Sequence, residues 1–267
     1  MTEHRFRVES GDQFRLSDYD PADTQGMTER ECCEVLERNR GRIAELQNTL
    51  YAEDKRSLLV VLMAMDTGGK DPIIRDVLSA ANPQACRVTA FKKASKHEEE
   101  QGRFLRFHQA APATGEIGVF NRSYYDEIIR ADAHGDLNDA ARDHAHEQIR
   151  NFERVLADAD RRIVKVFLHM SKEEQRARLQ ERIDRRERQW ELSESDFSER
   201  AYWEGYMEAF ESAIRDTHTE FAPWYVITSD RKWFRDAAAS IIIAETLEDM
   251  DPQFPPPKVD LSRIEWH

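Results

Sequence analysis

The stretch from Ser57 to Asp71 constrains the fold of this chain most, because an apolar run leads into a glycine turn that ends in a lysine. Residues 58–63 are all apolar, as a buried strand requires, and Gly68, Gly69 and Lys70 close the turn. A helix is expected over 72–81. Strand, tight loop, lysine and helix are the layout of a phosphate-binding P-loop, whose unpaired N–H groups at a helix start bind an anion. The sequence therefore predicts a phosphate ligand; a plain strand-to-helix turn is the alternative.

The loop departs from the usual pattern of Gly, four residues, Gly-Lys and then Ser or Thr. Ala64 replaces the first Gly, and Asp71 replaces the Ser or Thr. If position 64 requires a positive φ, the alanine methyl costs about 1 kcal/mol. Without the hydroxyl the usual magnesium ligand is missing. Asp66, inside the loop, is the candidate either to hold the metal or to take a proton from the attacking group.

Length and charge limit the class of protein. The 267 residues suffice for one large α/β domain or for one domain with an appended lid. A net charge of −13 argues against general nucleic-acid binding, which needs a basic face. We find no apolar run of membrane-spanning length and no charged-then-apolar leader pattern. Cys32, Cys33 and Cys86 show neither pairing nor metal spacing, so a reducing, cytoplasmic location is expected.

An anionic ligand in so acidic a chain needs a local basic patch. Residues 161–188 contain ten Lys or Arg against five Asp or Glu, whereas residues 189–220 contain two against nine. Such blocks are usually solvated helix faces. The contrast between the neighbouring blocks nevertheless favours a functional cationic surface.

Strands and helices are expected to alternate along the chain. Residues 1–26 lack periodicity and are expected to form an irregular arm, and Thr28 and Glu31 form a capping box that opens a helix over 28–51. A second capping box, Ser171 and Glu174, opens a later helix. Strands are expected at 57–63, 86–91, 116–120, 163–169 and 224–228. Further helices are expected at 97–109, 123–130, 139–159, 196–217 and 231–247.

This alternation predicts a mostly parallel sheet with helices on both faces, a three-layer α/β fold. Ligands of such sheets bind at the carboxyl ends of strands, where Lys70 and Asn121 are both expected. Asn121 can bind a metal weakly or orient a water. Arg122 offers a planar fork that matches phosphate oxygens. Ser123 is interpreted as a helix cap.

At these residues the chain resembles the family-2 polyphosphate kinases. The matching segments are Met65–Asp71, Asn82-Pro83-Gln84, Phe91-Lys92, Gly115–Tyr125, Phe167–Gln175, Ala222–Ile227 and Asp230–Trp233. The resemblance begins near residue 6 and covers nearly all of the chain. Asn121, where other members carry Asp, resembles the class III subgroup, which phosphorylates both nucleoside mono- and diphosphates.

The resemblance implies reversible transfer of the terminal phosphate of inorganic polyphosphate to AMP, ADP or both, with Mg²⁺. Adenine nucleotides are the implied partners, with guanine nucleotides as the alternative. The implied fold is a P-loop kinase, one domain over 1–267, with an N-terminal arm and helix over 1–55 and a helical lid over 182–200. The ordinary alternative for the lid is an amphipathic helix.

The resemblance also assigns roles to residues. The implied catalytic residues are Asp66, which also binds the metal, Lys70, Asn121, Arg122 and, from the lid, Arg182. Thr67, Gly68, Gly69, Arg75, Lys92, Lys93 and Asp126 are the implied substrate-binding residues. Trp190, Trp203, Trp224 and Trp233 are expected to be packing residues, with contact to a base as a second role for Trp190.

Some positions depart from the family. Members usually carry Gly at the positions of Ala64 and Pro72 and Ala at that of Gly68, and residues 183–189 lack the customary proline. Two other functions stay open on this basis: an ATP-dependent nucleoside monophosphate kinase, and a polyphosphate-binding protein that no longer transfers phosphate. The long amphipathic N-terminal helix favours a homo-oligomer.

Overall fold

The computed structural model describes residues 5–92, 94–260 and 262. Its centre is one five-stranded sheet in the order β2-β3-β1-β4-β5, in which all four strand pairs are parallel. The strands are β1 (Ser57–Ala64), β2 (Cys86–Ala90), β3 (Ile117–Asn121), β4 (Arg161–His169) and β5 (Trp224–Thr228). The expected strands and the parallel sheet are confirmed.

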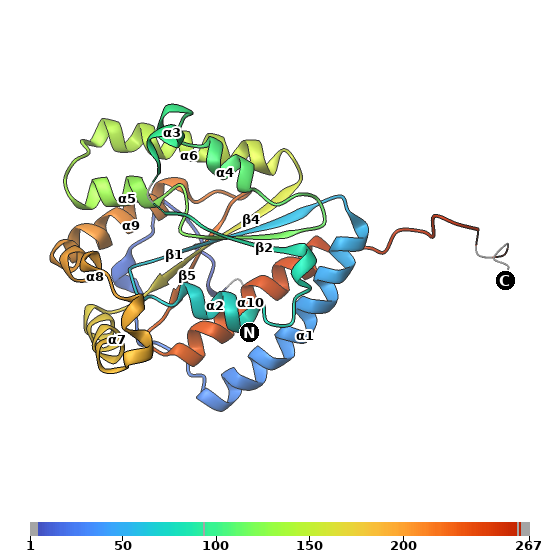
Figure 1. The fold of residues 1–267 in the computed structure, drawn as a ribbon, viewed down its shortest axis with the longest axis horizontal. Coiled ribbons are helices and arrows are strands. Elements are labelled where there is room, and N and C mark those ends of the chain that lie inside the picture. The colour runs from blue at the N-terminus through green and yellow to red at the C-terminus, as the bar shows by residue number, and fades with distance from the viewer. Residues whose placement is uncertain (1–4, 93, 261, 263–267) are drawn as a thin grey trace.

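Helices cover both faces of the sheet, so the molecule has three layers (Figure 1). The α-helices are α1 (Glu29–Glu53), α2 (Lys70–Val77), α3 (Lys96–Glu100), α4 (Leu105–Ala110), α5 (Asp126–Ala133), α6 (Asp139–Ala157), α7 (Lys172–Asp184), α8 (Glu194–Ser198), α9 (Trp203–Thr217) and α10 (Lys232–Met250). Short 3₁₀ turns lie at Leu16–Asp18 (η2), Pro83–Ala85 (η3), Arg186–Glu191 (η4) and Glu199–Tyr202 (η5).

The alternation of side chains along β1 divides the core in two. Leu59, Val61 and Met63 join the cluster formed with α4, α5, α6 and α9. Leu58, Val60 and Leu62 join the cluster formed with α1, α2 and α10 on the other face. Because β1 is buried on both faces, its sequence is continuously apolar rather than alternating. This central strand therefore delivers the loop that follows it to a fixed place at the sheet edge.

Three expected helices differ from the structure. The helix expected at 72–81 is α2, which begins at Lys70, directly after its N-cap Gly69 at φ 110°, and ends at Val77. The helix expected at 97–109 divides into α3 and α4 around Gly102, which has a φ of 96°. The helix expected at 196–217 divides into α8, η5 and α9.

Two smaller expectations need correction. The capping box at Thr28 and Glu31 is present, but at Ser171 only one half exists. The Ser171 hydroxyl accepts from the N–H of Glu174, whereas the N–H of Ser171 donates to Asp230 Oδ1 at 2.8 Å. The N-terminal arm, expected to be irregular, also pairs with the sheet. Its residue Arg7 forms an antiparallel bridge with Tyr225 of the edge strand β5, which buries the neighbouring Phe6.

Candidate active site

The loop between β1 and α2 presents free backbone N–H groups. Within the described residues, the N–H groups of Thr67, Gly69, Lys70 and Asp71 donate to no protein acceptor, while that of Gly68 bonds Met65 O at 3.0 Å. Such groups at a helix start form an anion site, because the helix dipole adds to their own positive charge. The loop thus has the polar geometry that its sequence predicted.

Lys70 folds back over this loop. Its Nζ donates to Ala64 O at 3.1 Å, and the residue is only 8% exposed. Burial lowers the pKa of Lys70 below its ordinary value, and the carboxylate of Asp66 is the largest influence that opposes this shift. A lysine in this position offers a local positive charge to an anion that enters the loop.

The chain departs from the family pattern at Ala64 and at Gly68, and the side chains at these two positions would contact each other. A Cβ added at Gly68 would lie well under 3.0 Å from the Cβ of Ala64 and 2.9 Å from Met65 O. The loop therefore has no room for a methyl at position 68 while Ala64 carries one. Ala64 itself has no positive φ, so the strain considered for this position is absent. The strained residue is Thr67, which is β-branched and has a φ of 65°.

The end of β3 meets this loop, as the strand-end argument predicted. Arg122 donates to Asp66 Oδ1 at 2.7 Å, and Asn121 Nδ2 donates to Asp71 Oδ1 at 2.6 Å. Arg122 also has a positive φ of 65°, which is uncommon for a residue other than glycine. Strained backbone at two facing positions is typical of a functional site.

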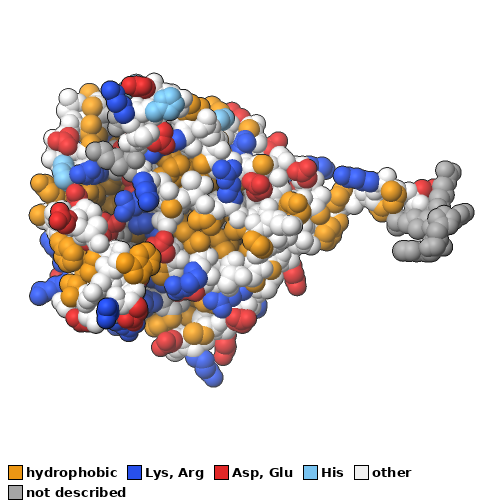
Figure 2. Space-filling view, in the orientation of Figure 1, with side chains coloured by type: hydrophobic (Ala, Val, Ile, Leu, Met, Phe, Trp, Pro, Cys, Tyr) orange, Lys and Arg blue, Asp and Glu red, His pale blue; other side chains and the backbone are white. Residues whose placement is uncertain are grey.

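A cavity of about 240 Å³ opens beside the loop. Its floor is apolar, formed by Met65, Phe91, Ile129 and Phe210, among others. Charged residues surround this floor: Asp66, Lys92, Arg106, Arg122, Asp126, Glu127, Arg130 and Glu199. Figure 2 shows basic side chains interspersed with acidic ones in the left half of its face, where the carboxyl ends of the strands lie. An apolar floor with a mixed charged rim suits a ligand with a flat apolar part and a charged part.

Two carboxylates of this cavity are strongly held. Asp126 accepts from the N–H of Ser123 at 2.6 Å. The N-cap of α5 is Tyr125, without a side-chain cap bond, so the interpretation of Ser123 as the helix cap is wrong. Burial raises the pKa of Asp126. Glu199 accepts from Tyr206 Oη and pairs with His134 Nε2, each at 2.7 Å. Sequence reasoning missed Glu199 and Arg130, because no local motif marks them.

Arg75 and Arg182, also predicted as site residues, do not line the cavity. Of the basic residues after β2, Lys92 lines it and Lys93 falls outside the described residues. The side chain of Arg75 is 73% exposed and pairs with Asp76. Arg182 Nε pairs with Glu191 at 3.1 Å and does not line the cavity.

The packing role expected for Trp190 is wrong. Trp203 and Trp224 are buried, and Trp233 packs against the core, but Trp190 is 81% exposed on η4. This tryptophan therefore stands in solvent within the segment expected to be a lid.

The basic block at 161–188 does not form a single cationic surface. Lys165 is fully buried on β4, where it pairs with Glu153 at 2.8 Å. Arg178 is also buried, and Arg185 and Arg188 pair with carboxylates of Glu181 and Glu191. Residues 161–188 therefore belong to different elements, and their basic side chains pair with different carboxylates instead of sharing one surface.

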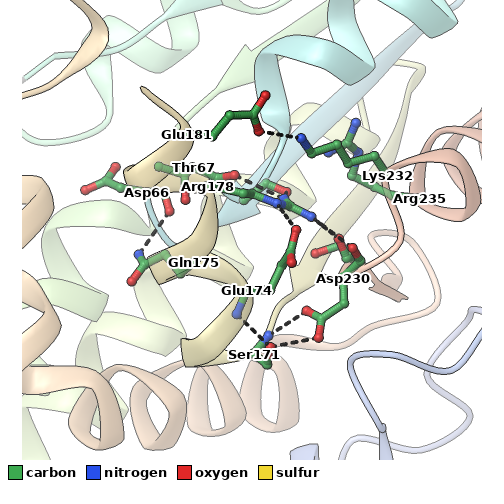
Figure 3. A network of polar contacts seen from close by, with 12 residues as sticks. Asp66, Thr67, Ser171, Glu174, Gln175, Arg178, Glu181, Asp230, Lys232 and Arg235 are labelled. Carbon is green, nitrogen blue, oxygen red and sulfur yellow. Dashed lines mark hydrogen bonds and ion pairs between the residues drawn. The ribbon is translucent and has the colours of Figure 1, made fainter. Parts of the chain in front are cut away.

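Sequence reasoning also missed the support behind the loop, which comes from α7 (Figure 3). Arg178 donates to the carbonyls of Thr67 and Gly68 at 3.1 and 3.2 Å. Gln175 Nε2 donates to the carbonyl of Asp66 at 3.0 Å. The two lie three residues apart on one helix face, but no sequence signal shows that this face meets residues 66–68.

The residues present fit a divalent cation that is shared with a ligand. In the described part of the chain no three His, Cys, Asp or Glu side chains cluster as a metal cage. Mg²⁺ rarely uses such a cage and instead takes one or two carboxylates together with substrate phosphates. Asp66 supplies such a carboxylate, since its side chain is 26% exposed beside the loop. No helix among the described residues has the length and apolar character needed to span a bilayer.

Comparison with known proteins agrees with this geometry. The chain is 40% identical over 262 residues to an AMP/ADP-polyphosphate phosphotransferase of Meiothermus ruber, covering 97% of this chain and 98% of that protein. It is 37% identical over 264 residues to an ADP-polyphosphate phosphotransferase of Rhodopseudomonas palustris, covering 94% of this chain and 91% of that protein.

Solved structures give the same result. The crystal structure of polyphosphate kinase 2 from Arthrobacter aurescens TC1 superposes with a TM-score of 0.93 at 34% identity, covering 98% of this chain and 94% of that one. The profile of the family described as "Polyphosphate kinase 2 (PPK2)" matches residues 27–255. The chain therefore belongs to the polyphosphate kinase 2 family.

Proposed function

We propose that this chain is a polyphosphate-dependent nucleotide kinase that reversibly transfers the terminal phosphate of inorganic polyphosphate to AMP and ADP. The observation that carries the proposal is the meeting of Asp66, Lys70 and Arg122 at one loop with free N–H groups. Relatives named as AMP/ADP- and ADP-polyphosphate phosphotransferases support it. Asn121 favours a chain that accepts both nucleotides, by its resemblance to class III.

Phosphoryl transfer depends on positioning and charge neutralisation more than on covalent chemistry. In the proposed mechanism the free N–H groups of Thr67, Gly69, Lys70 and Asp71, with the Lys70 side chain and the substrate-binding residue Gly68, hold the reacting phosphates. Arg122 leaves Asp66 and pairs with phosphate oxygens through its planar fork. One such donor typically contributes about 10²- to 10³-fold in rate.

Mg²⁺ is the cofactor in this proposal, with Asp66 as its protein ligand. When bound, the ion neutralises charge on the phosphate oxygens. Asp66 also orients the accepting phosphate. Asp126 faces the same cavity and completes the acceptor side. The adenine ring would lie on the apolar floor of the cavity.

Residues 182–200 are proposed as a lid within a single domain. Arg182 would leave Glu191 and close over the transferred phosphate, while Lys92 and Arg75 would line the path of the polymer. Cys32, Cys33 and Cys86 are free thiols, which is compatible with the proposed cytoplasmic location. Self-association through the N-terminal helix stays a prediction.

The test is incubation of the protein with Mg²⁺, polyphosphate and AMP or ADP, without ATP, followed by chromatographic resolution of the nucleotides. We expect ADP from AMP and ATP from ADP. Lys70→Ala and Asp66→Asn should each nearly abolish product while circular dichroism stays unchanged. Arg176→Ala, on the exposed face of α7, is the matched control and should retain activity. Product that forms only with ATP as donor, or near-normal turnover of either variant, would contradict the proposal.

A further inference from the structure

The carbonyl groups on the outer side of the phosphate-binding loop need hydrogen-bond donors. Turning the N–H groups of Thr67, Gly69, Lys70 and Asp71 towards an anion directs neighbouring carbonyls elsewhere, and carbonyls left without a donor in the interior are costly. Three consecutive carbonyls, those of Asp66, Thr67 and Gly68, find their donors on α7, in Gln175 and Arg178. The loop is thus supported from behind by side chains.

Arg178 is built into this place. The residue is 6% exposed, and its Nε donates to Glu174 Oε1 at 2.7 Å. Its Nη2 group donates to the carbonyls of Ser229 and Asp230, which follow β5. One planar guanidinium therefore joins the loop after β1 to the loop after β5 (Figure 3). A lysine has a single point of charge and cannot reproduce this set of directions.

Gln175 connects the phosphate-binding loop to residues 182–200, the segment expected to form the lid. The residue is 1% exposed, its Nε2 holds Asp66 O, and its Oε1 accepts from Arg200 Nη1. Arg200 also donates to Lys172 O at 3.1 Å. Both ends of residues 182–200 are therefore attached to the support of the loop: one through α7 and the other through Arg200.

The conformation of the loop shows why support is needed. Thr67 is β-branched with a φ of 65°, and its buried hydroxyl has no hydrogen-bond partner in the described chain. Such backbone persists only where its surroundings over-determine it. The donors to its own carbonyl and to both neighbouring carbonyls come from α7.

We propose that Arg178, together with Gln175, is a positioning residue of phosphoryl transfer: it holds the carbonyls of residues 66–68 so that the loop N–H groups stay aligned on the phosphate chain. This inference rests on the proposed function. Arg178 touches no substrate in this role and acts through the loop backbone. A misplacement of the loop by about 1 Å costs on the order of 10²-fold in rate.

The experiment compares Arg178→Met and Arg178→Lys with Arg176→Met, an exposed arginine of the same helix. We measure kcat and KM for polyphosphate with AMP as acceptor, per folded molecule, with circular dichroism giving the folded fraction. We expect kcat/KM to fall on the order of 10²-fold in Arg178→Met, to recover little in Arg178→Lys, and to stay within twofold in Arg176→Met. Addition of guanidinium ion at millimolar concentration should restore activity to Arg178→Gly and leave Arg176→Gly unchanged.

A kcat/KM per folded molecule within threefold of wild type in Arg178→Met overturns the inference, because the arginine would then only stabilise the fold. Should that variant fail to fold, Gln175→Glu decides: it keeps the acceptor for Arg200 and loses the donor to Asp66 O. We expect about tenfold loss from the missing hydrogen bond, and wild-type activity overturns the inference.

The proposed function fails separately, if the wild type forms no product. In that case calorimetric binding of tripolyphosphate decides the positioning role. Weaker binding to Arg178→Met than to wild type supports it, and equal or absent binding overturns it.

Discussion

Replacement of Gly68 by alanine tests whether the loop accommodates only one methyl group between positions 64 and 68. The added Cβ would lie well under 3.0 Å from Ala64 Cβ, whereas ordinary contact begins at 3.4 Å. Met65 O at 2.9 Å blocks retreat on another side. The loop must therefore shift by about 1 Å, which corresponds to on the order of 10²-fold in kcat/KM. Overpacking of this size also costs about 1–3 kcal/mol in stability.

The double variant Ala64→Gly/Gly68→Ala moves the methyl from one position to the other. It removes the Cβ–Cβ clash but leaves the introduced Cβ 2.9 Å from the backbone oxygen of Met65, so part of the loop shift remains. We therefore expect the double variant to regain part of the activity that Gly68→Ala loses, and Ala64→Gly alone to be near wild type. The two positions would show strong coupling in a double-mutant cycle.

The assay is polyphosphate-dependent phosphorylation of AMP together with urea unfolding of all four proteins. Full activity of Gly68→Ala would show that the loop absorbs the methyl and would refute the packing argument. Equal losses in Gly68→Ala and in the double variant would refute the pairing of the two positions, because the methyl of Ala64 would then not be what the introduced side chain meets.

Three further predictions concern other parts of the molecule. Lys165→Met leaves Glu153 fully buried without its cation and should cost about 3–5 kcal/mol in urea unfolding; a loss below about 1 kcal/mol would contradict the buried ion pair. Burial lowers the pKa of His169 to about 4, so the folded protein binds fewer protons than the unfolded chain between pH 4 and 6.5. The contribution of His169 to the free energy of unfolding is present above pH 6.5 and is lost as the pH falls towards 4. Urea unfolding at pH 7 and pH 4.5 measures this loss of stability, and His169→Gln should make it smaller. A loss of stability that is the same in His169→Gln and wild type would contradict the assignment. Trp190 fluorescence should shift to shorter wavelength when polyphosphate and nucleotide close residues 182–200, and Trp190→Phe should lack the shift; unchanged emission of the wild type would count against a lid.

The sequence was sufficient for the parts of the fold that local chemistry determines. The strand 224–228 was predicted with the bounds it has, because four apolar or aromatic residues and a β-branched threonine follow a proline. The meeting of Asn121 and Arg122 with the loop at 66–71 followed from the rule that parallel strands share a carboxyl edge. Both results depend on short patterns and on one general property of sheets.

The missed features depend on contacts between distant residues or on single backbone angles. Arg178 lies 111 residues from Thr67, and its periodicity within α7 does not show which carbonyls it meets. The division of the expected helix at 97–109 depends on the φ of 96° at Gly102, and a glycine inside a helical pattern does not by itself show that the helix ends there. Trp190 was expected to pack because tryptophan usually does, although the residues at 184–189 before it are all charged or polar and Trp190 is in fact exposed.

The acidic composition of the chain bears on how an anion is selected. Arg122 is paired with Asp66, Arg106 with Glu127, and Arg182 with Glu191. Each of these three arginines near the proposed site is therefore already neutralised by a carboxylate, and a phosphate chain must compete for it. A single phosphate gains little from such an exchange, whereas a polymer that displaces several carboxylates at once gains at each arginine while its own ordering cost is shared. The ion pairs thus favour long anions over short ones, which neither the net charge nor any single arginine would show.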